Sequence, residues 1–156
     1  MNAPMANGDD QWPECDPEYI KALGRAVYNF AVLEISVVWI MEHFKPGYLD
    51  EYGSQEKTAG TLAREFTEVT RHEKGHAAAA ELTANSKSFG DLKERRNKLL
   101  HANPAIMVID GQLSHGLHYQ AQDILWDIHT VRHAAVDFAA AAEKANVLLK
   151  NLITNP

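Results

Sequence analysis

The chain of 156 residues contains one cysteine, Cys15, so no disulfide can form within it, which is typical of a protein of the reducing cytoplasm. Its longest apolar run, about 31–41, is interrupted by Glu34 and Ser36, and we therefore expect no membrane span. The N-terminal sequence MNAPMANGDDQWPE has neither the basic start nor the apolar stretch of a signal peptide. We expect a cytoplasmic protein in which residues 1–15 form a disordered lead-in.

Positive charge is also in short supply. The net charge of −6 argues against a broad basic face that coats nucleic acid, so DNA is not an expected partner, although a small local phosphate site remains compatible with it. The sequence has no G-x-S-x-G turn and no glycine loop that would cradle a phosphate. Hydrolase chemistry based on a serine nucleophile is therefore not favoured.

Most of the sequence has apolar residues at helical spacing. Asp16 and Pro17 are a strong helix start, and Lys45-Pro46-Gly47 is a helix stop. The segment GYLDEYGS reads as a loop, and the Asp110-Gly111 turn between alternating residues predicts a small β-hairpin. The expected helices cover about 16–45, 56–72, 76–101 and 123–152. The fold class is thus all-α: an antiparallel up-and-down bundle of about four long helices, residues 16–154, with a hairpin before the last helix.

Two polar residues interrupt the apolar stripes of this bundle. The first helix carries a stripe from Ile20 to Phe44 in which Glu34 occupies an apolar position, and Arg96 does the same in the third helix, one step before Leu99. Burying two opposite charges in one small domain is least costly when they pair. We therefore expect Glu34 to approach Arg96.

Arg96 and His101 are the candidate catalytic pair, near the end of the third helix. A guanidinium binds phosphate through a planar fork of donors, and imidazole exchanges protons near neutral pH. Five helical residues separate the two side chains by about 7.5 Å of rise and about 140° of rotation. They are not stacked, but they can converge on a ligand at the helix end. The alternative is a structural salt bridge at Arg96 and a histidine that merely ends the helix.

Histidine motifs offer a rival function. His72-Glu73-Lys74-Gly75-His76 matches the H-E-x-x-H pattern of zinc peptidases, with Glu73 as the base. A charge and a helix breaker lie between the two histidines, and no third ligand follows, so we expect a chance match and no metal or other cofactor. The remaining pairs, His115 with His118 and His129 with His133, are expected on solvated surfaces, where they would at most bind adventitious metal.

The stretch from Arg96 to His101, RNKLLH, resembles the R-x(4–6)-H motif of HEPN domains, including the polar residue that follows the arginine, Asn97. The sequence LGRAVYNFAVLE, from Leu23 to Glu34, is similar to the opening helix of several HEPN-like families. The resemblance spans about 16–152 and implies a helical bundle that dimerises and brings two motifs into one cleft. Many members are metal-independent endoribonucleases in toxin–antitoxin, phage-defence or RNA-processing systems.

By this resemblance, Arg96 and His101 are catalytic, Asn97 is supporting, and Glu34 is an accessory residue near the cleft. RNA is the implied substrate and a protein antitoxin a further partner. Some toxin members carry a tyrosine two residues after the histidine, which an antitoxin modifies, and here that position is Asn103. Other members have lost activity and bind RNA or protein, so a non-catalytic helical dimer is the alternative function.

Overall fold

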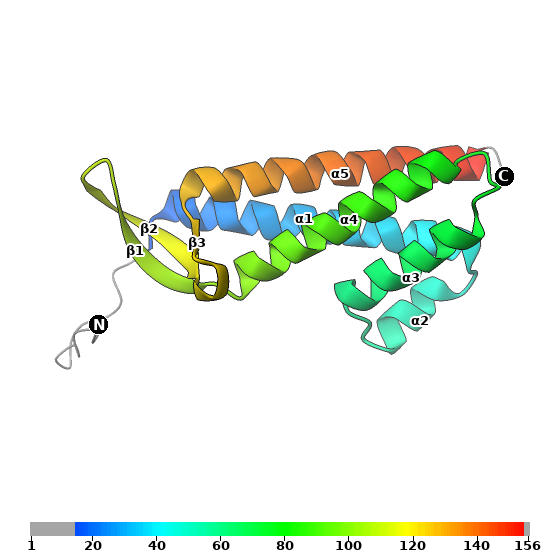
Figure 1. Cartoon of the computed structure of the whole chain (residues 1–156), viewed down its shortest axis with the longest axis horizontal. Helices are drawn as coiled ribbons and strands as arrows, with labels where there is room; N and C mark the ends of the chain where they lie inside the picture. The colour runs from blue at the N-terminus through cyan, green and yellow to red at the C-terminus, as the bar shows by residue number, and fades with distance from the viewer. Residues whose placement is uncertain (1–14, 155–156) are drawn as a thin grey trace.

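The computed structural model describes residues 15–154, and nearly all of the expected lead-in, residues 1–15, lies outside this range. Three long helices form the body, and a small sheet lies at one end (Figure 1). The elements in chain order are α1 (Pro17–Phe44), α2 (Tyr48–Ser54), α3 (Ala59–His72), α4 (Ala79–Leu100), β1 (Asn103–Ile109), β2 (Gln112–Tyr119), β3 (Ile124–Trp126) and α5 (Ile128–Thr154).

The start of α1 is the one that the sequence predicts. The Asp16 carboxylate accepts a hydrogen bond from the Glu18 N–H at 2.9 Å, and Pro17 occupies the first helical position. The helix ends at Phe44, before Lys45-Pro46-Gly47. The buried face of α1 is rotated from the expected one, as the exposure of Ile20 and Val27 shows. The core positions are instead Tyr19, Ala22, Ala26, Phe30, Leu33, Val37, Ile40 and Met41.

The expectation of a loop at GYLDEYGS was wrong, because this segment is the short helix α2. The left-handed Gly47, with φ of +91°, turns the chain into it. The Glu42 carboxylate accepts hydrogen bonds from the N–H groups of Gly47 and Leu49, at 2.9 and 2.8 Å. An acidic side chain from the preceding helix thus satisfies the free donors at the start of α2.

The next two helices begin later than expected. Helix α3 starts at Ala59 instead of about residue 56, because the Thr58 side chain caps it by accepting from Thr61 N–H at 3.2 Å. Helix α4 starts at Ala79 instead of about residue 76. Leu82, Phe89 and Leu99 are buried on α4, as their spacing predicts.

The expected hairpin is present and is extended by a strand that was not expected. Asp110 and Gly111 have φ of +51° and +78°, as a two-residue turn of this twist requires, and β1 pairs with β2 in antiparallel register. Residues Leu117 to Tyr119 then pair with β3. The last helix was expected from about residue 123, but Asp123 has φ of +52° and α5 begins only at Ile128.

The core lies where the three long helices meet. Helices α1 and α5 run side by side along most of their length, and α4 crosses them (Figure 1). The Phe30 ring stacks on Phe89 of α4 at 5.9 Å and meets Phe138 of α5 edge-on at 5.2 Å, measured between ring centroids. Residues 15–154 therefore form a mostly helical fold of five α-helices with a three-stranded antiparallel sheet before the last helix. The expectation of an all-α bundle of four long helices with a hairpin before the last helix was correct in its helical character and in the hairpin, but not in the all-α class or in the number of helices.

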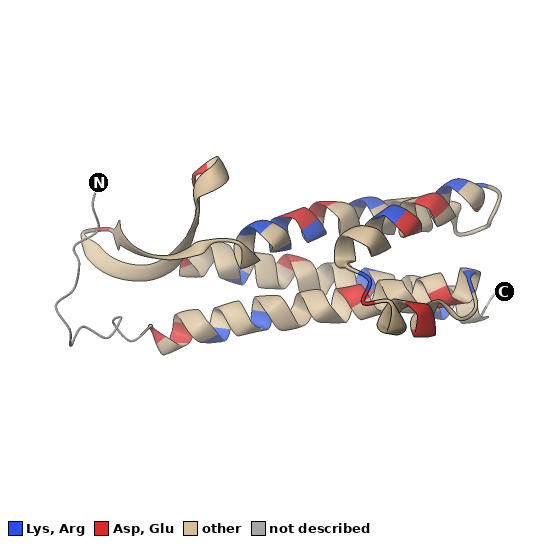
Figure 2. Ribbon diagram, turned by 90° about the horizontal axis from the view of Figure 1, so that it is seen from below, with Lys and Arg blue, Asp and Glu red and all other residues tan. Residues whose placement is uncertain are grey.

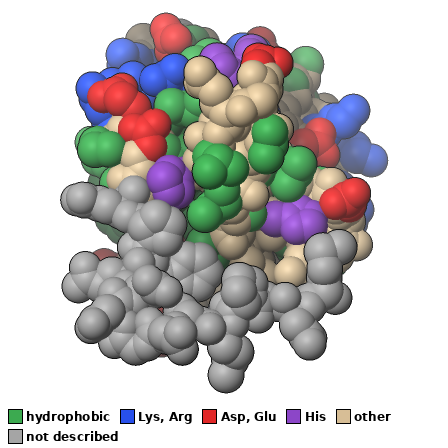
Figure 3. Space-filling model, turned by 90° about the vertical axis from the view of Figure 1, so that its left-hand side faces the viewer, with side chains coloured by type: hydrophobic (Ala, Val, Ile, Leu, Met, Phe, Trp, Pro, Cys, Tyr) green, Lys and Arg blue, Asp and Glu red, His purple; other side chains and the backbone are tan. Residues whose placement is uncertain are grey.

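Two surface features complete the fold. Hydrophobic side chains and histidines gather at the sheet end of the molecule (Figure 3), where Ile106, Val108 and Leu113 are exposed. Contrary to expectation, α1 is long and apolar enough to cross a membrane, judged by length and composition alone, with a mean hydropathy of 1.4. Core helices of globular proteins reach the same values, and α1 buries Phe30 and Leu33 against its neighbours.

Candidate functional site

Arg96 and Glu34 come together as the sequence predicts. Arg96 projects from α4 toward α1, and its Nη2 lies 3.6 Å from Oε2 of Glu34. Both side chains are 22% exposed, so each keeps some contact with solvent. Partial burial makes the attraction stronger than for a fully exposed pair and leaves one side of the guanidinium accessible.

Two further groups hold the guanidinium. Its centre lies 4.7 Å from the centroid of the Phe30 ring, and Nη1 donates to Oδ1 of Asn97 at 2.9 Å. Asn97, predicted as a supporting residue, therefore contacts Arg96 directly. A guanidinium has more N–H donors than these contacts use, so donors remain for a phosphate.

Tyr52 is the site residue that sequence reasoning missed. It comes from α2, and its hydroxyl donates a short hydrogen bond to Oε1 of Glu34. Burial, followed by the hydrogen bond to Glu34, raises the pKa of Tyr52 well above its ordinary value, so the group stays protonated and acts as a donor. The available signal was the spacing of Tyr48 and Tyr52, which are four residues apart and therefore share one helical face.

His101 takes a different position. It is the C-terminal cap of α4, and its backbone N–H donates to the Asn97 carbonyl at 3.0 Å. The side chain is exposed, and within residues 15–154 the imidazole makes no hydrogen bond or ion pair. The structure thus brings Glu34, Arg96 and Asn97 into contact, whereas His101 lies at the helix end beside them and not in contact with Arg96.

Residues 29–34 of α1, NFAVLE, supply several of the contacts that place Arg96 and α5. The Asn29 amide donates to the Ala135 carbonyl of α5 at 2.8 Å, and Leu33 is buried. Phe30 and Glu34 lie one turn apart on α1. The Arg96 guanidinium packs on the Phe30 ring and pairs with the Glu34 carboxylate. One helical segment therefore fixes α5 on one side and the arginine on the other.

The H-E-x-x-H segment does not form a helical ligand pair. His72 is the last residue of α3, Glu73 is its cap, and His76 lies in the following turn. His76 Nδ1 accepts the Ala78 N–H at 3.0 Å, and its ring meets Phe44 edge-on at 5.6 Å. In the part of the chain that the structure describes, no group of three or more metal-ligating side chains is present.

Of the other two histidine pairs, both expected on solvated surfaces, only the pair on α5 is exposed. His129 and His133 are exposed on α5, as expected. His115 and His118 are half-buried in β2, and His118 Nε2 lies 2.9 Å from Oδ1 of Asp123. His118 therefore contributes to the fold of the sheet end by joining β2 to the turn before β3.

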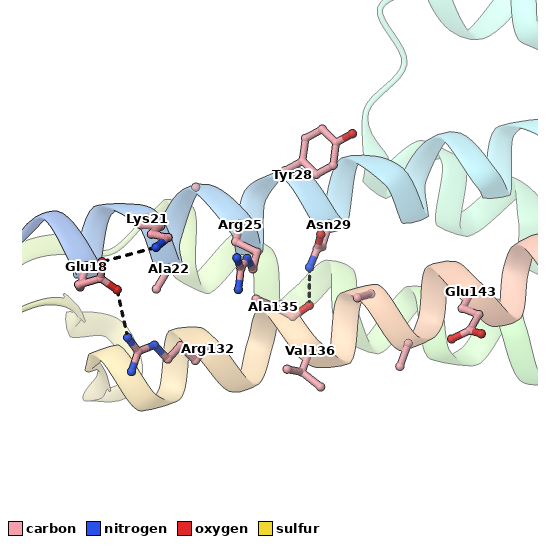
Figure 4. A pocket seen from close by; sticks show the side chains of 13 residues that line it. Glu18, Lys21, Ala22, Arg25, Tyr28, Asn29, Arg132, Ala135, Val136 and Glu143 are labelled. Carbon is pink, nitrogen blue, oxygen red and sulfur yellow. Dashed lines mark hydrogen bonds and ion pairs between the residues drawn. The ribbon is translucent and has the colours of Figure 1, made fainter.

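An open groove of about 1160 Å³ runs between α1 and α5 (Figure 4). Glu18 lies between Lys21 and Arg132, 3.6 Å from each, and alanines of α5 form much of the floor. Neither Arg96 nor His101 lines this groove. It is a separate feature from the arginine cluster.

The chain matches no protein-family model, no curated protein and no solved structure.

Proposed function

We propose that this chain is a HEPN-like, metal-independent endoribonuclease that acts as a cytoplasmic homodimer. The observation that supports the proposal most directly is the Arg96 cluster. A partly exposed guanidinium is held by Glu34, Asn97 and Phe30 close to the end of the helix that carries His101. An oriented phosphate-binding group and an unengaged imidazole at one helix end are the two chemical elements that RNA cleavage needs.

In the proposed reaction, the ribose 2′-hydroxyl attacks the adjacent phosphorus. The bond from phosphorus to the 2′-oxygen forms, the bond to the 5′-oxygen breaks, and the products end in a 2′,3′-cyclic phosphate and a 5′-hydroxyl. Arg96 stabilises the charge on the pentacoordinate phosphorus, while His101 takes the 2′-hydroxyl proton and, as imidazolium, gives a proton to the leaving 5′-oxygen. Asn97 and Glu34 support Arg96.

The outward face of α1 is the proposed dimer surface. Figure 2 shows few charged residues along the middle of α1, and Val27, Ala31 and Ile35 form an exposed apolar row one helical turn apart. Val27 and Ile35 are 40% and 43% exposed, and Glu34 borders the same row. A second copy packed on this row would bring two Arg96 clusters to one interface, where RNA, or an antitoxin protein that blocks it, would bind.

The experiment that tests the proposal is incubation of the protein with total RNA in EDTA. We expect the wild type to cleave and to leave 2′,3′-cyclic ends, and we expect His101→Ala to lose at least about 100-fold in rate. His133→Ala removes an exposed histidine from α5 and is the matched control, with unchanged cleavage. Cleavage that EDTA abolishes, or that persists in His101→Ala, would contradict the proposal.

A second function, a non-catalytic dimer that binds RNA, is favoured by one observation. The Arg96 guanidinium is already engaged by three protein groups, so fewer of its donors are free to stabilise a reacting phosphate. This function predicts that both the wild type and His101→Ala bind an intact RNA and that neither cleaves it, whereas Arg96→Ala weakens binding.

A further inference from the structure

Tyr52 reaches the arginine cluster from an element that packs on the outside of the bundle. Its ring is half-buried against the core and stacks with Tyr48 at 6.3 Å between ring centroids. Only its hydroxyl extends to Glu34. A tyrosine used for packing alone would not need a polar partner at this position.

The two oxygens of Glu34 have different partners. Oε1 accepts from the Tyr52 hydroxyl, and Oε2 lies 3.6 Å from Nη2 of Arg96. The carboxylate therefore cannot rotate without losing one of the two contacts. Fixing the carboxylate plane in turn fixes the direction of the Arg96 guanidinium, which otherwise sits on a long flexible side chain.

We propose that Tyr52 is a positioning residue: it holds Glu34, and Glu34 holds Arg96 in the orientation in which it binds the phosphate of RNA. This inference rests on the proposed function for the identity of the ligand. The orientation of Arg96 by Tyr52 is a separate physical statement, and it is measurable with no RNA present.

Contacts other than the one to Glu34 hold α2 in place. Lys57 Nζ lies 2.6 Å from Glu51 and 3.0 Å from Glu65, and Lys45 Nζ lies 3.3 Å from Glu51. Glu42 holds the first turn through two backbone N–H groups. Removing the Tyr52 hydroxyl should therefore leave α2 docked and change only the Glu34 contact.

Tyr48 provides a closely matched control. It lies one turn before Tyr52 on α2, and its hydroxyl also donates to a glutamate, but that glutamate, Glu65, is paired with Lys57 and not with Arg96. Tyr48→Phe and Tyr52→Phe thus delete the same group from the same helix. A purely structural role for the hydroxyl would give the two variants similar effects.

The first measurement is the NMR signal of the Arg96 Nε–H group, identified by its loss in Arg96→Lys. We expect Tyr52→Phe and Glu34→Gln to shift it and to speed its exchange with water, and Tyr48→Phe to leave it unchanged. The double variant Tyr52→Phe/Glu34→Gln should shift the Arg96 signal no more than the single variant with the larger effect does. The reason is that both substitutions act through the same contact. An unchanged signal in Tyr52→Phe, or an equal change in Tyr48→Phe, would overturn the inference.

The second measurement is RNA cleavage in EDTA. We expect Tyr52→Phe to lower kcat roughly tenfold with KM little changed, because a misdirected arginine weakens the transition state more than the bound substrate. Full kcat in Tyr52→Phe would overturn the catalytic part of the inference. If the wild type does not cleave RNA at all, the proposed function fails, and the Arg96 signal still decides whether Tyr52 orients the arginine.

Discussion

Gly116 lies in β2 at a position where a side chain would collide with both neighbouring strands. A Cβ atom there would come within 2.8 Å of the Trp126 carbonyl oxygen and 2.0 Å of the Met107 Cε atom. The methionine can move, but the carbonyl belongs to the backbone and accepts the Tyr19 hydroxyl at 2.8 Å. The absence of a side chain at Gly116 is therefore a requirement for joining the sheet to α1.

We predict that Gly116→Ala lowers the free energy of unfolding by about 1–3 kcal/mol, because the new methyl group forces β2 and β3 apart. Chemical denaturation followed by circular dichroism measures the change. Gly90→Ala is the control: apart from its chain neighbours and the backbone of its own helix, no atom of the described residues lies within 4 Å of the added Cβ, and alanine favours the helix by about 0.5–1 kcal/mol. Equal effects of the two substitutions would contradict this account.

The contact between Glu34 and Arg96 was predictable residue by residue. Each is a charged residue at an apolar position of a helical stripe, and the cost of burying an unpaired charge identifies the partner. The Tyr52 contact was not predictable, because it depends on where α2 docks. The spacing of Tyr48 and Tyr52 places both on one helical face, but it does not specify which carboxylate either hydroxyl reaches.

At the scale of elements, charges and hydrogen bonds add to the hydrophobic packing of α2, whose Tyr48 side chain is buried in the core. The Lys57 side chain is only 7% exposed and bridges two carboxylates. Hydrogen bonding to Lys57 lowers the pKa of Glu51, and hydrogen bonds from Tyr48 and Lys57 outweigh burial and lower that of Glu65. Burial lowers the pKa of Lys57, but its hydrogen bonds to Glu51 and Glu65 outweigh burial and raise the pKa overall.

These shifts predict how stability depends on pH. Because both carboxyl groups have a lower pKa in the folded state, their contribution is fully present above the ordinary value of 4.5 and is lost as the pH falls below it. We predict that Lys57→Met lowers the free energy of unfolding by roughly 1–3 kcal/mol at neutral pH and flattens the acid-side decrease. Urea denaturation across the acidic range measures both quantities.

Lys21→Met is the control for this prediction. Lys21 is 65% exposed in its pair with Glu18, at 3.6 Å, so its loss should change neither the stability nor the pH dependence appreciably. Parallel pH profiles for the wild type and Lys57→Met would show that the buried lysine does not hold α2.

The elements that sequence analysis placed correctly are those with strong caps and long periodicity. Asp16 and Pro17 define the start of α1, and the Asp110-Gly111 turn defines the hairpin. The strand β3 was missed because it is three residues long and is formed only by pairing with Leu117–Tyr119. Pairing between separate segments is a tertiary effect, and a local apolar pattern such as Ile124-Leu125-Trp126 fits a helix equally well.

At the scale of the whole molecule, α1 has two apolar faces. One face packs on α4 and α5, and the other exposes an apolar row with Tyr28 and Trp39 beside it, 69% and 46% exposed. An aromatic side chain carries roughly 150–250 Å² of surface, so these two residues alone present a considerable apolar area to solvent. Exposed apolar area of this kind on a helix marks an interaction surface.

We predict that Ile35→Lys weakens the proposed homodimer about tenfold or more, because it places a charge in the apolar row. Sedimentation velocity over a range of concentrations measures the dissociation constant. Val108→Lys puts the same charge on an exposed apolar position of β1, away from α1, and should leave the dimer unchanged. A wild type that is monomeric at every concentration, or equal weakening by both variants, would contradict the proposed surface.

The position of His101 has a consequence for how such a protein changes over evolutionary time. The exposed imidazole makes no hydrogen bond or ion pair within residues 15–154, and the link from His101 to Asn97 is made by the backbone, which any residue type except proline supplies. The arginine cluster depends on Glu34, Asn97 and Phe30 and would survive the loss of the histidine. A single substitution at residue 101 would therefore convert a nuclease of this design into a stable RNA-binding protein at almost no cost to folding.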